Sequence, residues 1–414
     1  MDKEMDGRIS ELQEQLRQGK ITRREFLRYA TLLGFSLAAA EVLAACHPTM
    51  PSTPTSTPPK PEAKGMGVEP EEASTPPLPA REAMWYTPLT DNKVQCELCP
   101  RRCIALDGQR GYCEVRENRG GKLYTLVYGN PCAVHIDPIE KKPFNHFLPA
   151  TTALSIATVG CNLECAYCQN WHISQARPEE VQSYDLPPEE VVKIALEKEC
   201  ESIAYTYTEP TIFYEYMFDT AKLARSKGIR NVIVTAGFIN LEPLRELCKF
   251  IDAIRVDLKG FTQDFYMNVC NGALGPVLKT LKTIQEEGVW LEIINLVVPT
   301  LNDDPKDIKR MCQWIKGNLG FDVPLHFTRF YPMYKLKSLP PTPIETLEKA
   351  REIALNEGLH YVYIGNVPGH PAEDTYCPKC GKLLIDRAGF FVTENHIVDG
   401  KCEYCGEPIP GVWK

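Results

Sequence analysis

Eleven of the 17 cysteines in this 414-residue chain fall in three tight groups, and these groups limit what the chain can fold into. They are Cys96, Cys99, Cys103 and Cys113, then Cys161, Cys165 and Cys168, and finally Cys377, Cys380, Cys402 and Cys405. Gaps of two residues suit metal sites, because they bring two sulfurs to one side of a short turn. Disulfides are the alternative, but a chain of this length with 43% hydrophobic residues has enough core to fold without them. The sequence therefore predicts metal-binding thiolates on a globular fold.

The scattered cysteines predict buried thiols, and the overall charge argues against one class of partner. We expect Cys132 to be a buried thiol near a packed His135. The other scattered cysteines, apart from Cys46, should be small buried hydrophobic side chains, namely Cys200, Cys248, Cys270 and Cys312. The formal net charge of −8 argues against a broad surface that neutralises phosphates, so the sequence predicts no nucleic-acid partner.

Residues 1–46 have the pattern of an export signal. The string T-R-R-E-F-L contains the pair Arg23 and Arg24, and an apolar stretch over 29–45 follows that is too short to prefer spanning a bilayer. The stretch ends in L-A-A-C, which resembles a bacterial lipobox with Cys46 as the lipid-bearing residue. We expect export by the twin-arginine route and a lipid anchor in the membrane. The alternative is an uncleaved signal that keeps the protein on the cytoplasmic face of the membrane.

The remaining chain divides into a tether and three folded parts. Residues 47–80 are rich in Pro, Thr, Ser and Glu, and they cannot bury enough surface to fold alone. Strand-like runs then alternate with helical segments such as 188–198 and 211–226. The strand-like runs are 153–159, 202–206, 231–235, 253–258, 290–297 and 325–330. Such a repeat predicts an α/β fold with a partial (β/α)6 TIM-like barrel over 151–370, between an N-terminal cysteine-rich module (81–150) and a C-terminal zinc-ribbon-like module (371–414).

The middle group of cysteines lies where a barrel carries its active site. The first predicted strand ends at Gly160 and runs into Cys161-x3-Cys165-x2-Cys168, and active sites of such barrels lie at the carboxyl ends of the strands. A [4Fe-4S] cubane needs four iron ligands. Three thiolates on one short loop leave one iron free, to which S-adenosylmethionine (SAM) can bind through its amino and carboxylate groups. A structural zinc loop is the alternative, but no fourth ligand is evident nearby.

Several strings resemble the radical SAM superfamily, and within it the branch that contains the pyruvate formate-lyase activating enzyme. The nearest resemblance is to the AmmeMemoRadiSam system radical SAM enzyme, over about 94–413. The strings are C-E-L-C-P-R-R-C, D-P-I-E-K-K-P, C-Q-N-W-H-I-S-Q, Y-T-Y-T-E-P-T-I-F-Y-E-Y, V-D-L-K and G-N-V-P-G-H, together with the final cysteine module. The resemblance implies radical chemistry that starts from SAM at the cluster of Cys161, Cys165 and Cys168.

The resemblance also implies residues that contact SAM. Thr208 and Glu209 match a turn that binds the SAM amino group, with Glu209 as the acceptor, although Glu209 also fits the start of a helix. The other implied contacts are Tyr167 beside the cluster, Thr235 near the SAM ribose, Lys259 facing the SAM carboxylate, and Asp257 facing a cation or substrate. A surface ion pair is the alternative for Asp257 and Lys259. Tyr331 stands where relatives carry a histidine, which suggests altered substrate contacts.

The two flanking cysteine groups predict further metal sites. The C-terminal knuckles, each followed by glycine, fit a zinc ribbon in which four sulfurs hold one structural zinc, with rubredoxin-type iron as the alternative. The spacing of the N-terminal group serves zinc or an auxiliary [4Fe-4S] cluster equally well.

The predicted function is that of a radical SAM enzyme whose 5'-deoxyadenosyl radical takes hydrogen from an unknown substrate, either a glycine of a partner protein or a small molecule. Such an enzyme also needs an electron donor. The alternatives are an exported iron–sulfur electron carrier and a scaffold that has lost its catalysis.

Overall fold

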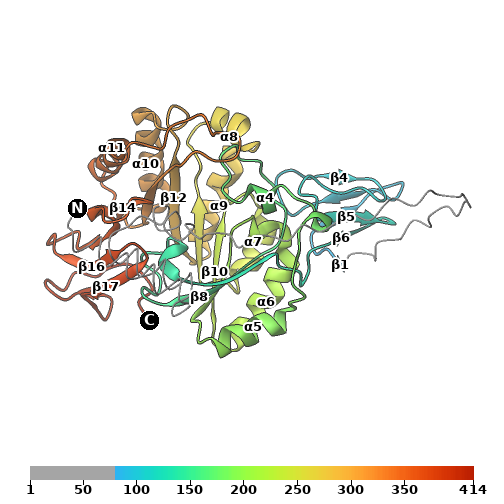
Figure 1. Ribbon diagram of the computed structural model, residues 1–414, viewed down its shortest axis with the longest axis horizontal. Coiled ribbons are helices and arrows are strands. Elements are labelled where there is room, and N and C mark those ends of the chain that lie inside the picture. The colour runs from blue at the N-terminus through green and yellow to red at the C-terminus, as the bar shows by residue number, and fades with distance from the viewer. Residues whose placement is uncertain (1–79) are drawn as a thin grey trace, which may run out of the picture. The chain divides into compact units, whose positions relative to one another are not determined.

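An eight-stranded sheet runs through the computed structural model, which describes residues 80–414 (Figure 1). The strand order is β14-β13-β12-β11-β10-β9-β8-β7. Neighbouring strands from β8 to β14 are parallel, and β7 is antiparallel to β8 at one edge. These strands are β7 (Ala133–Pro138), β8 (Thr152–Ala157), β9 (Ser202–Tyr205), β10 (Arg230–Thr235), β11 (Ala253–Asp257), β12 (Trp290–Val297), β13 (Leu325–Arg329) and β14 (Val362–Gly365).

The predicted α/β repeat is confirmed, and six strand–helix units follow one another from β8 to β13. The six predicted strands all form, with ends that differ by two residues at most. The sheet also contains two strands that the sequence did not indicate, β14 and the antiparallel β7. β14 is only four residues long and therefore shows no clear periodicity.

Helices connect the parallel strands, as expected for right-handed crossovers. They are α4 (Trp171–Ser174), α5 (Pro188–Glu197), α6 (Tyr214–Ser226), α7 (Leu241–Cys248), α8 (Gln263–Cys270), α9 (Leu274–Glu286), α10 (Pro305–Leu319) and α11 (Ile344–Asn356). Short 3-10 turns are η1 (Ile139–Lys141), η2 (Pro178–Glu180), η3 (Pro210–Phe213) and η4 (Pro371–Glu373). The predicted helix over 211–226 thus begins as η3, and α6 continues it. Local signals set the starts of other helices, since the side chains of Thr262 and Asp304 cap α8 and α10.

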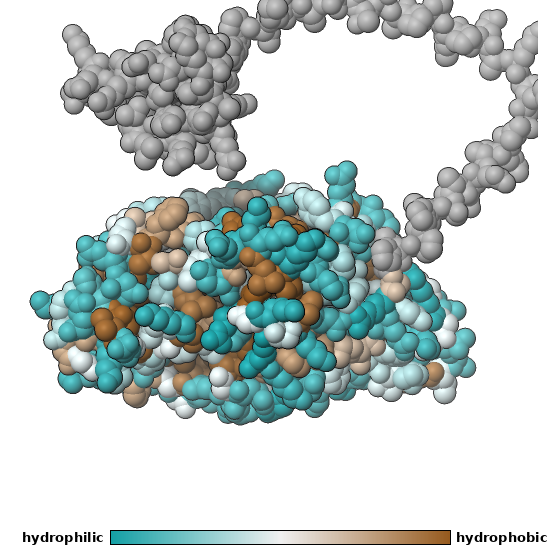
Figure 2. All heavy atoms as spheres, turned by 90° about the horizontal axis from the view of Figure 1, so that it is seen from below, coloured by the Kyte–Doolittle hydropathy of each residue, from teal (hydrophilic) through white to brown (hydrophobic). Residues whose placement is uncertain are grey.

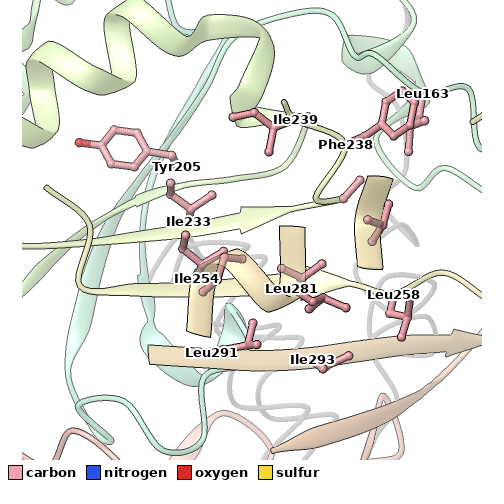
Figure 3. Close-up of a cluster of buried hydrophobic side chains, with 14 of the residues drawn as sticks. Leu163, Tyr205, Ile233, Phe238, Ile239, Ile254, Leu258, Leu281, Leu291 and Ile293 are labelled. Atoms are coloured by element: carbon pink, nitrogen blue, oxygen red, sulfur yellow. The ribbon is translucent and has the colours of Figure 1, made fainter. Parts of the chain in front are cut away.

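The main hydrophobic core lies between this sheet and its helices. Figure 3 shows Ile233, Ile254 and Ile293 on adjacent strands, with Leu281 of α9 over them. Leu163, from the loop that follows β8, joins the same core near Phe238. The cysteine-bearing loop is therefore anchored by apolar packing as well as by hydrogen bonds.

The N-terminal strands form two small antiparallel sheets. One consists of β1 (Arg81–Glu82), β6 (Lys122–Thr125) and β5 (Arg116–Arg119), and the other of β2 (Tyr86–Pro88), β3 (Val94–Cys96) and β4 (Ile104–Ala105). A buried ion pair fixes these sheets to α6. Arg116 donates two hydrogen bonds to Glu215, at 3.1 and 2.5 Å, and Glu215 also accepts the Met84 N–H at 2.9 Å. Each charge is thus compensated away from water.

The C-terminal residues form short strands at the β14 side of the sheet, which is the end opposite the N-terminal sheets in Figure 1. They are β15 (Thr375–Tyr376), β16 (Leu383–Ala388), β17 (Phe391–Asn395), β18 (Ile397–Val398) and β19 (Lys401–Cys402). A chain of side chains ties them to the barrel. Arg387 donates to Thr375 (2.9 Å), Thr375 contacts the Tyr363 hydroxyl (2.9 Å), and Tyr363 reaches His146 Nε2 (2.6 Å).

The predicted export signal with Arg23, Arg24 and Cys46, and the tether up to residue 79, lie outside the described residues. Export, lipid anchoring and the alternative at the cytoplasmic face therefore stay predictions. Within residues 80–414, no helix combines the length and the apolar character needed to cross a bilayer. On the face shown in Figure 2, apolar side chains form small patches separated by hydrophilic ones.

The geometry of the buried His146 predicts a pH dependence of stability. Its Nδ1 lies 2.6 Å from the Pro410 carbonyl, which only accepts, so Nδ1 carries the proton and Nε2 accepts from Tyr363. Burial lowers the pKa of His146 from 6.5 to about 4. Between these pH values the unfolded chain binds more protons than the folded one. The free energy of unfolding should therefore fall as the pH falls through this window, by up to about 3 kcal/mol.

Urea unfolding between pH 4 and pH 6.5 measures this effect. His146→Gln should flatten the dependence of the urea midpoint on pH. His326, whose pKa burial also lowers, contributes with the same sign and should leave a residual slope. His360→Gln is the matched control, because His360 is exposed and pairs with Asp322 at the surface. An unchanged slope in His146→Gln would contradict the prediction.

Candidate functional site

The loop that follows β8 carries Cys161, Cys165 and Cys168, as the sequence predicted. It begins at Gly160, whose φ is +96°. A Cβ atom there would lie 2.7 Å from Val115 Cγ1 and 2.8 Å from the Cys113 carbonyl oxygen. Only glycine fits this conformation and this close approach. The N-terminal module therefore lies directly against the start of the cysteine loop.

Backbone hydrogen bonds hold the loop on the end of α8. Glu164 N donates to the Cys270 carbonyl (3.0 Å), and Ala166 N donates to the Val269 carbonyl (2.8 Å). On the other side, Lys335 N donates to the Ala166 carbonyl at 2.9 Å. The path of the loop is thus set by the backbone of distant segments, which leaves its cysteine side chains available as ligands.

The three thiols are shielded from water. Burial, with the nearby charge of Glu209, raises the pKa of Cys161 well above its usual value. A hydrogen bond with Cys270, together with burial, also raises the pKa of the Cys165 thiol well above its usual value. Cys168 contacts the Ser174 hydroxyl at 3.2 Å. Thiolates at such a site need positive charge close by, which bound iron supplies.

Glu209 is almost completely buried and already has four protein donors. Its Oε1 accepts from Thr211 N (3.1 Å), Thr211 Oγ1 (2.7 Å) and Thr235 Oγ1 (2.6 Å), and its Oε2 accepts from Ala236 N (2.8 Å). Glu209 is therefore the helix cap that the sequence allowed, at the start of η3. Oε2 retains room for one more donor. Thr235 binds Glu209 rather than pointing freely into the site, while the Thr208 hydroxyl donates to the Thr158 carbonyl (2.8 Å).

Asp257 and Lys259 are not the exposed surface pair that the sequence left open. Arg255 and Lys259 both donate to the Asp257 carboxylate, at 2.5 and 3.2 Å, and all three side chains are largely buried. Burial alone would lower the pKa of Lys259, but the neighbouring Cys165 and Asp257 outweigh it and raise the pKa. Lys259 Nζ also lies 6.0 Å from the Tyr167 ring centre. A buried cation is thus held beside the cysteine loop.

A pocket with both apolar and charged lining residues opens at the carboxyl ends of β13 and β14. Its lining includes Tyr167 from the cysteine loop, His326 and Arg329 from β13, and Arg387 from the C-terminal module. Tyr331 also lines it, half exposed, with its hydroxyl 3.2 Å from the Asn366 carbonyl. Both alternating sets of residues contribute to the pocket, since His326 and Thr328 line it together with Arg329 and Tyr331.

The two flanking cysteine groups differ in geometry. Within residues 80–414, the only set of three or more Cys, His, Asp or Glu ligand atoms that all lie within 4.8 Å of one another is the C-terminal one. There, Cys377 and Cys405 sulfurs are 3.6 Å apart, and Cys380 and Cys402 sulfurs 3.7 Å apart. Zinc–sulfur bonds of about 2.3 Å give tetrahedral edges of about 3.8 Å, so this set fits a single tetrahedral ion. The cysteines of the N-terminal group surround one cavity with a wider spacing.

The chain matches the radical SAM superfamily over residues 155–314. Uncharacterized protein MJ0808 of Methanocaldococcus jannaschii is 50% identical over 331 residues, which are 80% of this chain and 98% of that protein. The pyruvate formate-lyase-activating enzyme of Clostridium pasteurianum is 26% identical over 167 residues, 38% of this chain and 67% of that enzyme. The chain belongs to the radical SAM superfamily. It is therefore an enzyme, and membership implies a [4Fe-4S] cluster, reductive cleavage of SAM and an electron donor.

Solved structures also resemble this radical SAM protein. A radical SAM methyltransferase from Sphaerobacter thermophilus aligns over 88% of this chain and 96% of its own, with 13% identity and a TM-score of 0.43. A domain of a pyruvate-formate lyase-activating enzyme from Bacteroides vulgatus aligns over 40% of this chain and 99% of its own, with 18% identity and a TM-score of 0.36.

Cys270 is the residue near the cluster loop whose place the sequence did not reveal. Cys270 is buried in the main core, as expected, and its sulfur also lies 3.6 Å from the Tyr167 hydroxyl. It stands more than 100 residues after the cluster motif and has no partner cysteine nearby in the sequence. No local spacing could have identified it.

Gly160→Ala tests the close approach of the N-terminal module to the cluster loop. The added methyl should clash with Val115 and the Cys113 carbonyl, and should lower stability by about 2 kcal/mol beyond the cost of the φ angle. Urea unfolding and iron content per chain measure the effect, and iron should fall with stability.

Gly228→Ala is the matched control. Gly228 also has a positive φ, +79°, but nothing lies within 4 Å of the position that a Cβ would take there. It should cost only about 1 kcal/mol and leave iron unchanged. Equal losses of stability in Gly160→Ala and Gly228→Ala would show that the close contact of Gly160 with the N-terminal module does not contribute to stability.

Proposed function

We propose that Cys161, Cys165 and Cys168 hold the [4Fe-4S] cluster of this enzyme and leave one iron free for SAM. Their placement on one buried loop at the carboxyl end of β8 is the observation that carries the proposal. When bound and reduced, such a cluster supplies the electron that cleaves SAM to methionine and a 5'-deoxyadenosyl radical. The electron-carrier alternative has no support from the superfamily match, which covers this loop.

The surrounding residues would position SAM. The free position on Glu209 Oε2 suits the SAM amino group, and buried Lys259 suits its carboxylate. The hydrogen bonds from Thr211, Thr235 and Ala236 fix the Glu209 carboxylate in one orientation. This pre-organisation lowers the entropic cost of binding SAM in a reactive geometry. Thr235 acts through Glu209 in this proposal, and not through the SAM ribose.

The substrate would bind in the pocket between β13, β14 and the C-terminal module. Tyr167 lines both this pocket and the cluster loop, so a bound molecule there lies next to the cluster site. His326 donates to the buried Glu292 carboxylate at 2.8 Å, which fixes its ring at the pocket wall. Arg329 and Tyr331 add a cation and a hydroxyl at the more exposed end. The hydrogen atom is then taken from a substrate group held in this pocket, away from bulk water.

Reductive SAM cleavage tests the proposal. Anaerobically reconstituted protein, reduced with dithionite, should convert SAM to methionine and 5'-deoxyadenosine, which chromatography detects. Cys161→Ala, Cys165→Ala and Cys168→Ala should each abolish the reaction, because each leaves one iron without its protein ligand.

Cys312→Ala is the matched control, since this buried thiol lies on α10 in the main core and should not affect cleavage. Cleavage that persists after all three substitutions would contradict the proposed ligands. Wild-type protein that binds SAM without cleaving it would instead support the scaffold alternative.

We further propose that the C-terminal group binds one structural zinc. The sulfur spacing supports a single ion, and Arg387 from β16 donates to the Asn145 carbonyl at 2.9 Å, so the module stabilises the barrel beside the substrate pocket. Elemental analysis should give about one zinc per chain, and Cys402→Ser should remove it. Cys248→Ser is the control that keeps the zinc. Iron in place of zinc would assign the module to electron transfer.

A further inference from the structure

The N-terminal cysteines line one common cavity although they come from separate segments. Cys96 ends β3, Cys99 and Cys103 lie in the turn before β4, and Cys113 precedes β5. All four belong to the lining, and the remaining wall is largely apolar. Four convergent sulfurs in a closed apolar site are a ligand set rather than packing.

One of these sulfurs also receives a backbone N–H. Tyr112 N donates to Cys103 Sγ at 3.4 Å. Hydrogen bonds of this kind stabilise a sulfur that carries negative charge.

A buried cation at the cavity wall indicates an anionic occupant. Arg116 is only 2% exposed and lines the cavity. Two of its nitrogens bind Glu215, but its Nε is buried without any hydrogen-bond partner. A guanidinium N–H left unpaired in an apolar site costs free energy. Four thiolates bound to iron carry net negative charge, and their sulfur atoms would accept the Arg116 Nε–H that has no partner in the protein.

The spacing of the sulfurs separates a cluster from a single ion. In the described part of the chain, the C-terminal cysteines lie within 4.8 Å of one another, whereas neither the N-terminal group nor the set Cys161, Cys165 and Cys168 does. In a cubane each thiolate binds a different iron, so its sulfurs lie farther apart than around one ion. The N-terminal group thus shares a wider spacing with Cys161, Cys165 and Cys168, and differs in this from the C-terminal group.

We propose that Cys96, Cys99, Cys103 and Cys113 bind a second [4Fe-4S] cluster, with one thiolate on each iron. The sequence left zinc and a cluster equally open at this group, and the spacing favours the cluster. All four irons have protein ligands, so none is open to SAM or substrate. The site lies against the other cluster loop, because Cys113 contacts Gly160 and Arg101 Nε donates to the Asn162 carbonyl at 2.6 Å.

Iron counting and electron paramagnetic resonance on the full chain test this proposal. After anaerobic reconstitution with iron and sulfide, wild-type protein should contain about eight irons per chain, from two cubanes. The triple variant Cys161→Ala/Cys165→Ala/Cys168→Ala should keep about four, with a dithionite-reduced signal that SAM does not change. The quadruple variant with alanine at the N-terminal cysteines should also keep about four, with a signal that SAM shifts.

Cys132→Ala is the control for loss of a nearby thiol, and it should retain all the iron. Cys132 is partly buried against the same core and does not line the cavity. An iron-free triple variant that contains a second zinc would overturn the proposal. If the quadruple variant fails to fold, the triple variant still decides, since its N-terminal group is intact. Failure of the proposed function would give a different result. The signal that SAM shifts would be absent, and the signal of the N-terminal cluster would remain.

Discussion

The close packing of three backbone segments at the end of β8 is the constraint on which the site depends. Gly160 admits the Cys113 carbonyl where no side chain fits, and the end of α8 accepts two hydrogen bonds from the cysteine loop. The loop is thus shaped from outside, by the N-terminal module on one side and α8 on the other. Cysteine side chains that are to serve as ligands cannot also hold their own loop, so rigid neighbours have to do so.

Buried side chains of opposite charge lie next to one another in two places in the fold. Arg116 and Glu215 join the N-terminal sheets to α6, and Arg255, Asp257 and Lys259 form a second group beneath the cluster loop. A pair of this kind adds little net stability over an apolar contact, but removing one partner leaves a charge without compensation. Such interactions therefore favour one arrangement of the modules over others, and they add little to the free energy of unfolding.

Much of the fold could be predicted from sequence, because parallel strands buried on both faces are continuous apolar runs between amphipathic helices. The strand over 290–297 has the predicted ends. The loop that carries Cys161, Cys165 and Cys168 was also predictable, since the spacing of these cysteines is local. The contact of Cys270 with Tyr167 and the Arg116–Glu215 pair were not, because long-range packing decides them. The spacing of the N-terminal cysteine group left its metal open, and the distances between the sulfurs, which are wider than in the C-terminal group, became known only from the structure.

The hydrogen-bond chain from Arg387 through Thr375, Tyr363 and His146 to the Pro410 carbonyl has a fixed direction, since arginine only donates and a carbonyl only accepts. Every proton in the series is therefore assigned. The last acceptor is the carbonyl of Pro410, which follows the C-terminal cysteine group. A change that moves Pro410 would leave a protonated ring nitrogen unpaired in the interior, so the packing of this segment and the protonation of a buried histidine depend on each other.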